Sequence, residues 1–183
     1  MTAMNTNTLP VLHTERLILR PTTIEDFPRW VELMVDPVAT LYIGGMQTPS
    51  LAWRSLMAMA GAWSLTGVSM FSLVERGSGR LVGRCGPWQP HGWPGTEVGW
   101  SLHPDAQGQG YATEAAQAAI DYAFDVLGWT DVIHCIDPKN TPSQRVALRL
   151  GSSNRGPGKM PPPHENAPCD IWGQTREQWR ARR

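Results

Sequence analysis

The sequence carries few charges, and neither sign is in excess. Of its 183 residues, 16 are lysine or arginine and 16 are aspartate or glutamate, which gives no net charge at pH 7 with neutral histidines. A neutral chain lacks the general attraction to nucleic acid and anionic lipid that a basic chain has. We therefore expect neither nucleic acid nor a membrane surface among its partners.

Cysteines and long apolar runs are scarce as well. The three cysteines, Cys85, Cys135 and Cys169, form no C-x-x-C motif, so we expect neither a disulfide framework nor a metal site. The sequence has no run of about 18 apolar residues that could cross a membrane. Residues 1–10 form a polar, loose tail without the apolar core of a secretory signal. These features predict a cytoplasmic protein.

Hydrophobic residues, in contrast, are plentiful and make up 41% of the chain. With no internal repeat and no long linker, we expect one domain over residues 1–183. Nine residues are tryptophan, and Trp88, Trp93 and Trp100 crowd one short region. Tryptophans mostly fill a core, but aromatic residues also line ligand pockets. Both interpretations of these three residues stay open.

Hydrophobic periodicity predicts that helices and strands are mixed along the chain. Helices are expected at about 24–35, 48–65, 112–127 and 140–150. Strands are expected at 17–20, 68–75, 81–88, 96–102, 131–136 and 170–172. Thr22 and Glu25 have the spacing of a capping box for the first helix. Residues 152–168 are rich in glycine and proline and are predicted to form a loop.

The segment 107–112, Gln-Gly-Gln-Gly-Tyr-Ala, joins a predicted strand to the long alanine-rich helix. The first amides of a helix have no partners inside it, and the helix dipole makes that end positive, so a glycine turn there can hold a phosphate. Ala112 leaves room, and Thr113 adds a hydroxyl donor. The segment lacks the Gly-Lys-Ser/Thr of a P-loop, and Thr113 stands where a dinucleotide motif has its third glycine. A helix start with flexible glycines and no ligand remains the alternative.

This segment resembles the Arg/Gln-x-x-Gly-x-Gly/Ala signature of the GNAT acetyltransferases. Residues 110–115 resemble the form found in the ribosomal-protein N-acetyltransferase branch. Residues 14–20 and 97–100, and Asn140-x-x-Ser143 followed by Leu150-Gly151, also resemble segments of that branch, in the same order. The resemblance covers roughly residues 11–152.

The resemblance implies an α/β (α+β) fold, with a twisted mixed sheet of six or seven strands flanked by helices. The fourth and fifth strands would splay apart, and acetyl-coenzyme A (acetyl-CoA) would lie between them as co-substrate. Backbone groups at 100–103 would pair with its pantetheine arm, and amides at 108–112 would hold its pyrophosphate. The implied cofactor-binding residues are Trp100, Ser101, Leu102, His103, Gln107, Gly108, Gln109, Gly110, Tyr111, Ala112, Thr113, Asn140 and Ser143.

The implied reaction is transfer of the acetyl group to a primary amine by direct attack in a ternary complex. Glu97 is the candidate base; its alternative role is a surface glutamate in an ion pair. Ser143 is the candidate proton source for the sulfur, because residues 140–150 lack the tyrosine usual in the family; its alternative role is a helix cap. His103 is a second candidate base, and Cys135 is a candidate acyl carrier.

The acceptor is left open between a protein N-terminus, which the ribosomal-protein branch implies, and a small amine such as a drug or polyamine. The absence of an acidic run disfavours a polycation, and the tryptophans near residue 93 favour an apolar acceptor. A catalytically silent acyl-CoA binding or sensor module is the alternative function, and a nicotinamide-dependent enzyme is a third. A homodimer would be compatible with the sequence.

Overall fold

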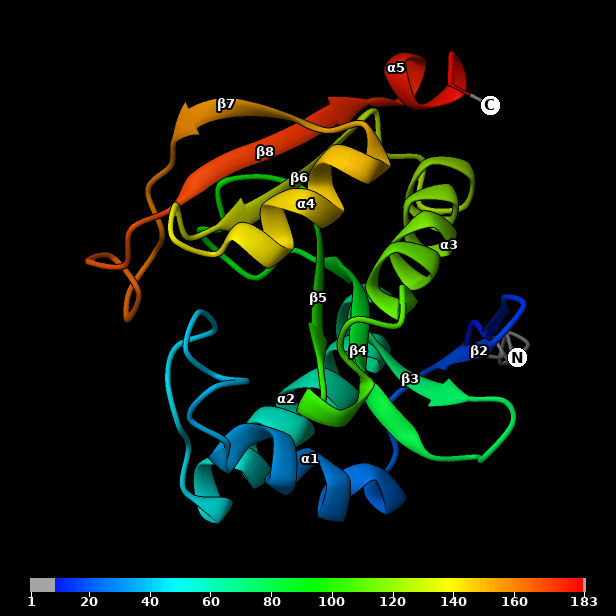
Figure 1. Cartoon of the computed structure of the whole chain (residues 1–183), viewed down its shortest axis with the longest axis vertical. Coiled ribbons are helices and arrows are strands. Elements are labelled where there is room, and N and C mark those ends of the chain that lie inside the picture. The colour runs from blue at the N-terminus through cyan, green and yellow to red at the C-terminus, as the bar shows by residue number, and fades with distance from the viewer. Residues whose placement is uncertain (1–8, 183) are drawn as a thin grey trace, which may run out of the picture.

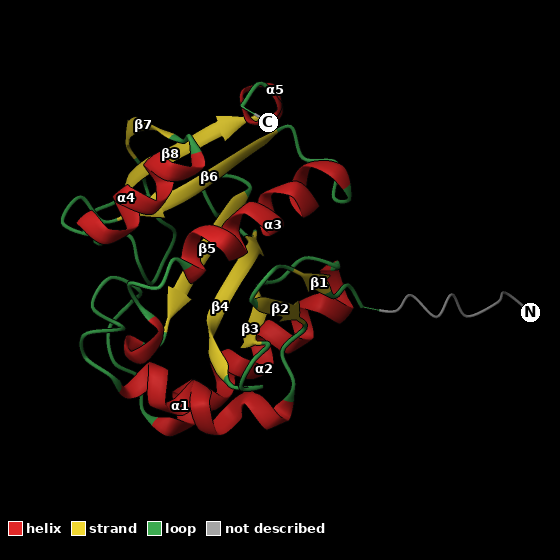
Figure 2. Ribbon diagram, turned by 45° about the vertical axis from the view of Figure 1, so that its right-hand side comes forward, coloured by secondary structure: helices red, strands yellow, loops and turns green. Residues whose placement is uncertain are grey.

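The computed structural model of the chain describes residues 9–182, which form one mixed sheet with helices packed around it (Figures 1 and 2). The helices are α1 (Phe27–Val35), α2 (Pro49–Thr66), α3 (Tyr111–Asp125), α4 (Thr141–Leu150) and α5 (Arg176–Arg180), with short 3-10 helices at Ile24–Asp26 and Pro104–Ala106. The strands are β1 (Leu12–His13), β2 (Leu17–Arg20), β3 (Phe71–Glu75), β4 (Leu81–Trp88), β5 (Glu97–Leu102), β6 (Asp131–Ile136), β7 (Ser153–Pro157) and β8 (Asp170–Thr175).

The order of strands in the sheet is β1-β2-β3-β4-β5-β6-β8-β7. Neighbouring strands are antiparallel except β5 and β6, which are parallel and share a single register pair, Glu97 with Ile133. Beyond that pair the two strands diverge (Figure 1). The predicted splay of the fourth and fifth expected strands is therefore confirmed, and it opens a gap in the middle of the sheet.

The two larger hydrophobic cores of residues 9–182 lie on opposite faces of the sheet, and a smaller cluster joins Ile136, Ala147 and Trp172. One core contains α3, whose small side chains at Ala115, Ala116 and Ala119 are fully buried and let the helix lie close to the strands. The other core joins α1 and α2. The consecutive residues Met70 and Phe71 belong to different cores, as expected for the alternating side chains of an extended chain.

The ends of α2 and α4 follow the local chemistry of their sequences. The hydroxyl of Thr48 accepts from the backbone N–H of Leu51 at 3.4 Å, and Gly67, with a φ of 70°, ends α2. Asn140 caps α4 by accepting from the N–H of Ser143 at 3.2 Å. The predicted starts of both helices are confirmed.

The predicted capping box before α1 was wrong by one residue. Its members are Thr23 and Asp26, and the Asp26 carboxylate accepts from the Thr23 N–H at 3.1 Å. Asp26 is fixed there by an ion pair with Arg20 at 2.6 Å, and Thr22 instead accepts from the hydroxyl of Ser72. The tertiary ion pair therefore decides which of two adjacent threonines caps the helix.

The sheet has eight strands rather than the six or seven expected. Strand β1 has only two residues, too few for a recognisable alternation. Strand β7 occupies Ser153–Pro157, so the predicted loop at 152–168 was wrong over its first part. β7 is an edge strand of mostly exposed residues, and it therefore lacks a hydrophobic pattern. Most of the predicted 1–10 tail, residues 1–8, lies outside the described residues.

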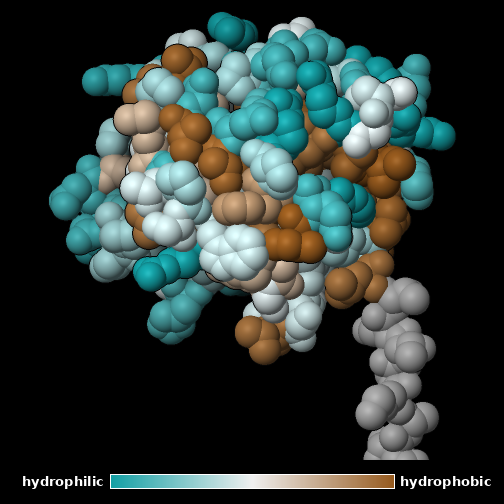
Figure 3. Space-filling view, turned by 90° about the horizontal axis from the view of Figure 1, so that it is seen from below, coloured by the Kyte–Doolittle hydropathy of each residue, from teal (hydrophilic) through white to brown (hydrophobic). Residues whose placement is uncertain are grey.

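The surface on the side of α1 and α2 shows apolar residues in small groups among polar ones (Figure 3). Exposed apolar residues of this region include Val38, Leu41, Met46 and Leu65. Among residues 9–182, none of the helices combines the length and the hydropathy that a membrane span requires.

Candidate active site

Two cavities of about 520 Å³ each meet at the gap between β5 and β6. The first, here called the Glu97 cavity, is lined from β4, β5 and β6 and by residues of the segments 41–47 and 160–169. The second, here called the α3 cavity, is lined from β5, from the segment 107–113 and from α4. Both are lined by Trp100, Ser101, Asn140 and Ser143. The splayed sheet thus holds a cleft with two compartments.

The entrance of α3 presents backbone donors to the α3 cavity. Among residues 9–182, the N–H groups of residues 110–113 have no acceptor; the first paired amide is that of Glu114, which donates to Gly110 O at 3.1 Å. Gly108 and Gly110 have φ angles of 75° and 83°, a left-handed conformation that favours glycine. Four free amides at a positive helix end suit a phosphate group.

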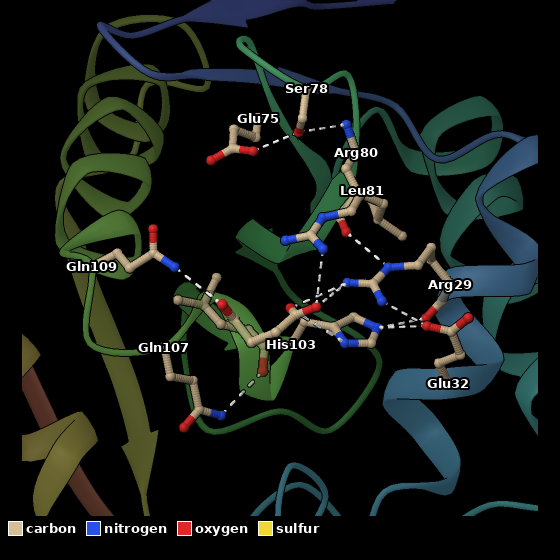
Figure 4. Close-up of polar contacts among 11 residues, drawn as sticks. Arg29, Glu32, Glu75, Ser78, Arg80, Leu81, His103, Gln107 and Gln109 are labelled. Carbon is tan, nitrogen blue, oxygen red and sulfur yellow. Dashed lines mark hydrogen bonds and ion pairs between the residues drawn. The ribbon is translucent and has the colours of Figure 1, made fainter.

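The side chains around this entrance hold it in place. Arg16 pairs with Glu114 at 2.7 Å and donates to the carbonyl O of Gln109 at 2.9 Å. The side chains of Gln107 and Gln109 donate to backbone carbonyls at 3.3 and 3.1 Å (Figure 4). Tyr111 is buried, and its hydroxyl donates to Glu75 at 2.5 Å. The predicted site residues Gln107, Gln109 and Tyr111 thus hold the loop in shape with these side-chain hydrogen bonds.

His103 lies away from both cavities. Its Nε2 is 2.9 Å from the carbonyl O of Arg29, and its ring lies between Glu32 and Asp105 in a network with α1 (Figure 4). The residue is buried and lines neither cavity. The ring of His103 is therefore not placed to act as a base in either cavity, although the residue lies near Gln107 and Gln109 (Figure 4).

Ser143 stands where the two cavities meet. The indole N–H of Trp100 donates to its hydroxyl oxygen at 3.3 Å. Asn140, and not Ser143, caps α4, so the capping role considered for Ser143 was wrong. Because the Ser143 hydroxyl accepts from Trp100, its own proton is free to be donated to a third group.

Glu97 is a buried carboxyl group, 6% exposed, on the wall of the Glu97 cavity. Its two oxygens accept from the indole N–H of Trp93 at 2.5 Å and from the backbone N–H of Cys135 at 3.0 Å. Burial raises the pKa of Glu97 to about 7, against the opposing effect of these hydrogen bonds and of Arg84. The surface ion-pair alternative was wrong, and the group is suited to exchange protons near neutral pH.

This raised pKa predicts how a Glu97→Gln variant changes stability. Between the unfolded pKa of about 4.3 and the folded value of about 7, the folded state binds the extra proton, so the free energy of unfolding falls as the pH rises through this window. Glutamine does not ionise. The stability of the variant relative to the parent should therefore be higher at about pH 8.5 than at about pH 5, by roughly 2–3 kcal/mol.

Urea unfolding at the two pH values measures this difference. Glu177→Gln, on an exposed part of α5, is the matched control. A relative stability of the Glu97 variant that does not change with pH would contradict the raised pKa.

The tryptophan cluster supports the pocket interpretation, because Trp88, Trp93 and Trp100 all line the Glu97 cavity. Cys135 lines it too, but a neighbouring cysteine, Cys169, together with burial raises the pKa of the Cys135 thiol. A protonated thiol is a poor nucleophile. The acyl-carrier role considered for Cys135 is therefore disfavoured.

Sequence reasoning missed Arg84, which lines the Glu97 cavity, and Arg145 and Arg149, which line the α3 cavity. Strand alternation predicts that one of His134 and Cys135 faces the cleft or solvent, and both of them line the Glu97 cavity. His134 is fully engaged, with ring nitrogens 2.7 Å from Val98 O and 2.9 Å from the Ser152 hydroxyl. The two α4 arginines are four residues apart and so lie on one helix face, a signal that the sequence contained. Nothing in the sequence indicated Arg84.

Comparison with known proteins places this cleft in context. A family model described as "Acetyltransferase (GNAT) domain" matches residues 16–153. The protein p20 of Bacillus licheniformis, named an uncharacterized N-acetyltransferase, is 30% identical over 153 residues, 81% of this chain and 85% of p20. An acetyltransferase structure from Agrobacterium tumefaciens str. C58 has a TM-score of 0.82 and 27% identity, covering 96% of this chain and 100% of that one.

A structure titled ribosomal-protein-S5-alanine acetyltransferase, from Vibrio fischeri, is more distant in sequence. It has a TM-score of 0.72 at 18% identity and covers 93% of this chain and 98% of its own. At this identity the likeness concerns the fold alone.

Proposed function

Because this chain belongs to the GNAT acetyltransferase family and is an acetyl-CoA-dependent acyltransferase, we propose that residues 1–183 act as one domain that acetylates a primary amine by direct attack in a ternary complex. The observation that carries this proposal is the meeting of two features at the β5–β6 gap. The free amides of the α3 entrance lie in one compartment, and the buried carboxyl group of Glu97 lies in the other.

The α3 cavity fits acetyl-CoA by the chemistry of its donors. The amides at residues 110–113 would hold the pyrophosphate, and Arg145 and Arg149 add positive charge for further phosphate oxygens. The backbone of residues 100–102 lies beyond the last β5–β6 register pair and would pair with the pantetheine arm. Asn140 would contact the same arm from α4. His103 has no direct part in this arrangement.

The amine must lose a proton to react, because free amines have pKa values of about 8 to 10. Acetyl-CoA supplies a thioester that a neutral amine attacks, with the coenzyme A thiol as leaving group. Glu97 lies in the cavity beside the gap, and its pKa of about 7 suits it to accept the proton of the amine, directly or through a water molecule.

The departing sulfur needs a proton in turn. The hydroxyl of Ser143 faces both cavities, and Trp100 fixes its oxygen by donating to it. Ser143 would give its proton to the sulfur and recover one from solvent. It thereby takes the place of the tyrosine that residues 140–150 lack.

The variant Ser143→Ala tests this role. Its kcat should fall about 10- to 100-fold, because the thiolate then leaves unprotonated, while the Kd for acetyl-CoA should change little. Steady-state thiol release and calorimetry measure the two quantities. Ser153→Ala, an exposed position on β7, is the control. An unchanged kcat would remove Ser143 from the mechanism.

The acceptor screen that tests the whole proposal uses thiol release from acetyl-CoA, first with peptides that have free N-termini and then with small amines. Turnover with any amine, lost in Glu97→Gln, supports the proposal. Tight binding of acetyl-CoA without turnover on the whole panel would instead favour the sensor module.

A further inference from the structure

Arg84 is a charged residue on the inner wall of the Glu97 cavity. It lies on β4 directly opposite Ser101 of β5, and it lines the cavity together with Glu97, Gly99 and Ser101. Alternate residues of a strand share a face, and opposite residues of antiparallel neighbours share it too. Arg84 and Glu97 therefore belong to the same face of the sheet. Ser101, the β5 partner of Arg84, lies four residues along β5 from Glu97.

Among residues 9–182, no carboxylate is in ion-pair contact with the guanidinium group of Arg84, and Glu97 acts on it only as a more distant charge. The guanidinium group makes no hydrogen bond or ion pair there, and its Nε atom is buried without an acceptor. Its recorded contact is with the ring of Trp30, whose centroid is 5.1 Å from Cζ. Burial lowers the pKa of Arg84 to about 10, so the group stays positively charged at neutral pH.

Two other arginines of the chain have a carboxylate in close contact. Arg20 is 2.6 Å from Asp26, and Arg155 is 2.7 Å from Asp131. Glu97, the acid that shares the cavity, has both oxygens occupied by Trp93 and Cys135. A partly buried guanidinium group whose buried Nε lacks an acceptor is costly to maintain, and such groups are candidates for binding sites. Arg84 is thus placed to pair with an anion that enters the cavity.

Gly99 lies between Glu97 and Ser101 on the wall of the cavity. The methyl group of Met70 packs directly over it, since a Cβ atom at Gly99 would lie 2.7 Å from Cε of Met70. Four strand residues span about 14 Å, a distance that the two side chains shorten as they enter the cavity from either end. Met70 and Trp88 line the same space and give it apolar walls.

We propose that the acceptor is a small amine that also carries a carboxylate, as an amino acid does, and that Arg84 binds this carboxylate while the amine lies at Glu97. The inference rests on the proposed function, since it takes the Glu97 cavity to be the acceptor site. The planar guanidinium group can bind both oxygens of a carboxylate at once. The apolar walls favour an apolar side chain on the acceptor.

Matched pairs of acceptors test the proposal. Each proteinogenic amino acid and its carboxamide are compared by thiol release from acetyl-CoA, with the parent, Arg84→Met, Arg84→Lys and the exposed-site control Arg180→Met. For the best acid, kcat/KM should exceed that of its amide about 100-fold. Arg84→Met should remove this preference, because it lowers kcat/KM for the acid far more than for the amide, and Arg84→Lys should keep part of the preference.

Three results would overturn the inference. The parent could prefer no acid over its amide, or the preference could survive in Arg84→Met. The third is that the parent and Arg84→Met acetylate peptide N-termini equally well. Thermal unfolding and coenzyme A affinity establish that the Arg84 variants are folded, and Arg84→Lys carries the test if Arg84→Met is not.

Calorimetric titration of the acids into the coenzyme A-loaded protein separates this inference from the proposed function. If the acids bind in a way that depends on Arg84 but are never acetylated, the carboxylate site is supported and the proposed acetyl transfer is contradicted. If amines are acetylated equally well with and without a carboxylate, the acetyl transfer is supported and the carboxylate site is contradicted.

Discussion

Glu97→Gln should lower kcat/KM for amine acetylation about 100- to 1,000-fold at pH 7, the range typical of a lost general base. Glutamine fills the same space and keeps one of the two hydrogen bonds made by Trp93 and Cys135, but it cannot take a proton. The parent should lose activity as the pH falls below about 7, because Glu97 becomes protonated there.

The variant should lack that acidic limb and recover part of its activity at higher pH, where the amine deprotonates unaided. Initial rates of thiol release across the pH range, with Glu177→Gln alongside, give both curves. If the variant and the parent have parallel pH profiles, Glu97 is not the base.

Gly110→Val should weaken acetyl-CoA binding about 100-fold, because a branched side chain at this position covers the free amides of the α3 entrance. The φ of Gly110 is 83°, so valine also strains the loop, and that effect must be separated from the loss of the phosphate site. Gly128 provides the control, because it follows α3 at its other end with a φ of 72° and open space around it.

Gly128→Val should lower the free energy of unfolding by a similar amount and leave the affinity for acetyl-CoA unchanged. Calorimetry with acetyl-CoA and thermal unfolding of both variants distinguish the two effects. Equal affinities for the two variants would show that the α3 entrance does not hold the coenzyme.

The parts of the site that the sequence predicted are local in the chain. The α3 entrance follows from two glycines before an alanine-rich helix, and the position of Asn140 follows from its place before Thr-Pro-Ser. Such features depend on neighbours within a few residues. The family resemblance, built on the same segments, is confirmed by the match over residues 16–153.

The parts that the sequence did not predict depend on contacts between distant segments. The burial of Glu97 depends on how β5 packs against distant parts of the chain. In the folded protein its carboxyl group lies against the indole of Trp93 and the backbone of Cys135. His103 was expected in the site because it follows β5, but contacts with α1 turn its ring elsewhere. The sequence around Arg84 has the pattern of an ordinary polar residue in an alternating strand, and only the assembled sheet shows that its Nε is buried without an acceptor.

The single register pair between β5 and β6 has a mechanical consequence. Five strands lie on one side of that pair and three on the other, and little backbone pairing spans the boundary beyond Thr96, Glu97 and the start of β6. A molecule seated in the gap touches both groups of strands and so contributes its own binding free energy to their association. Occupation of the gap should therefore stabilise the association of the two groups of strands, whereas each group keeps its own ladder of hydrogen bonds.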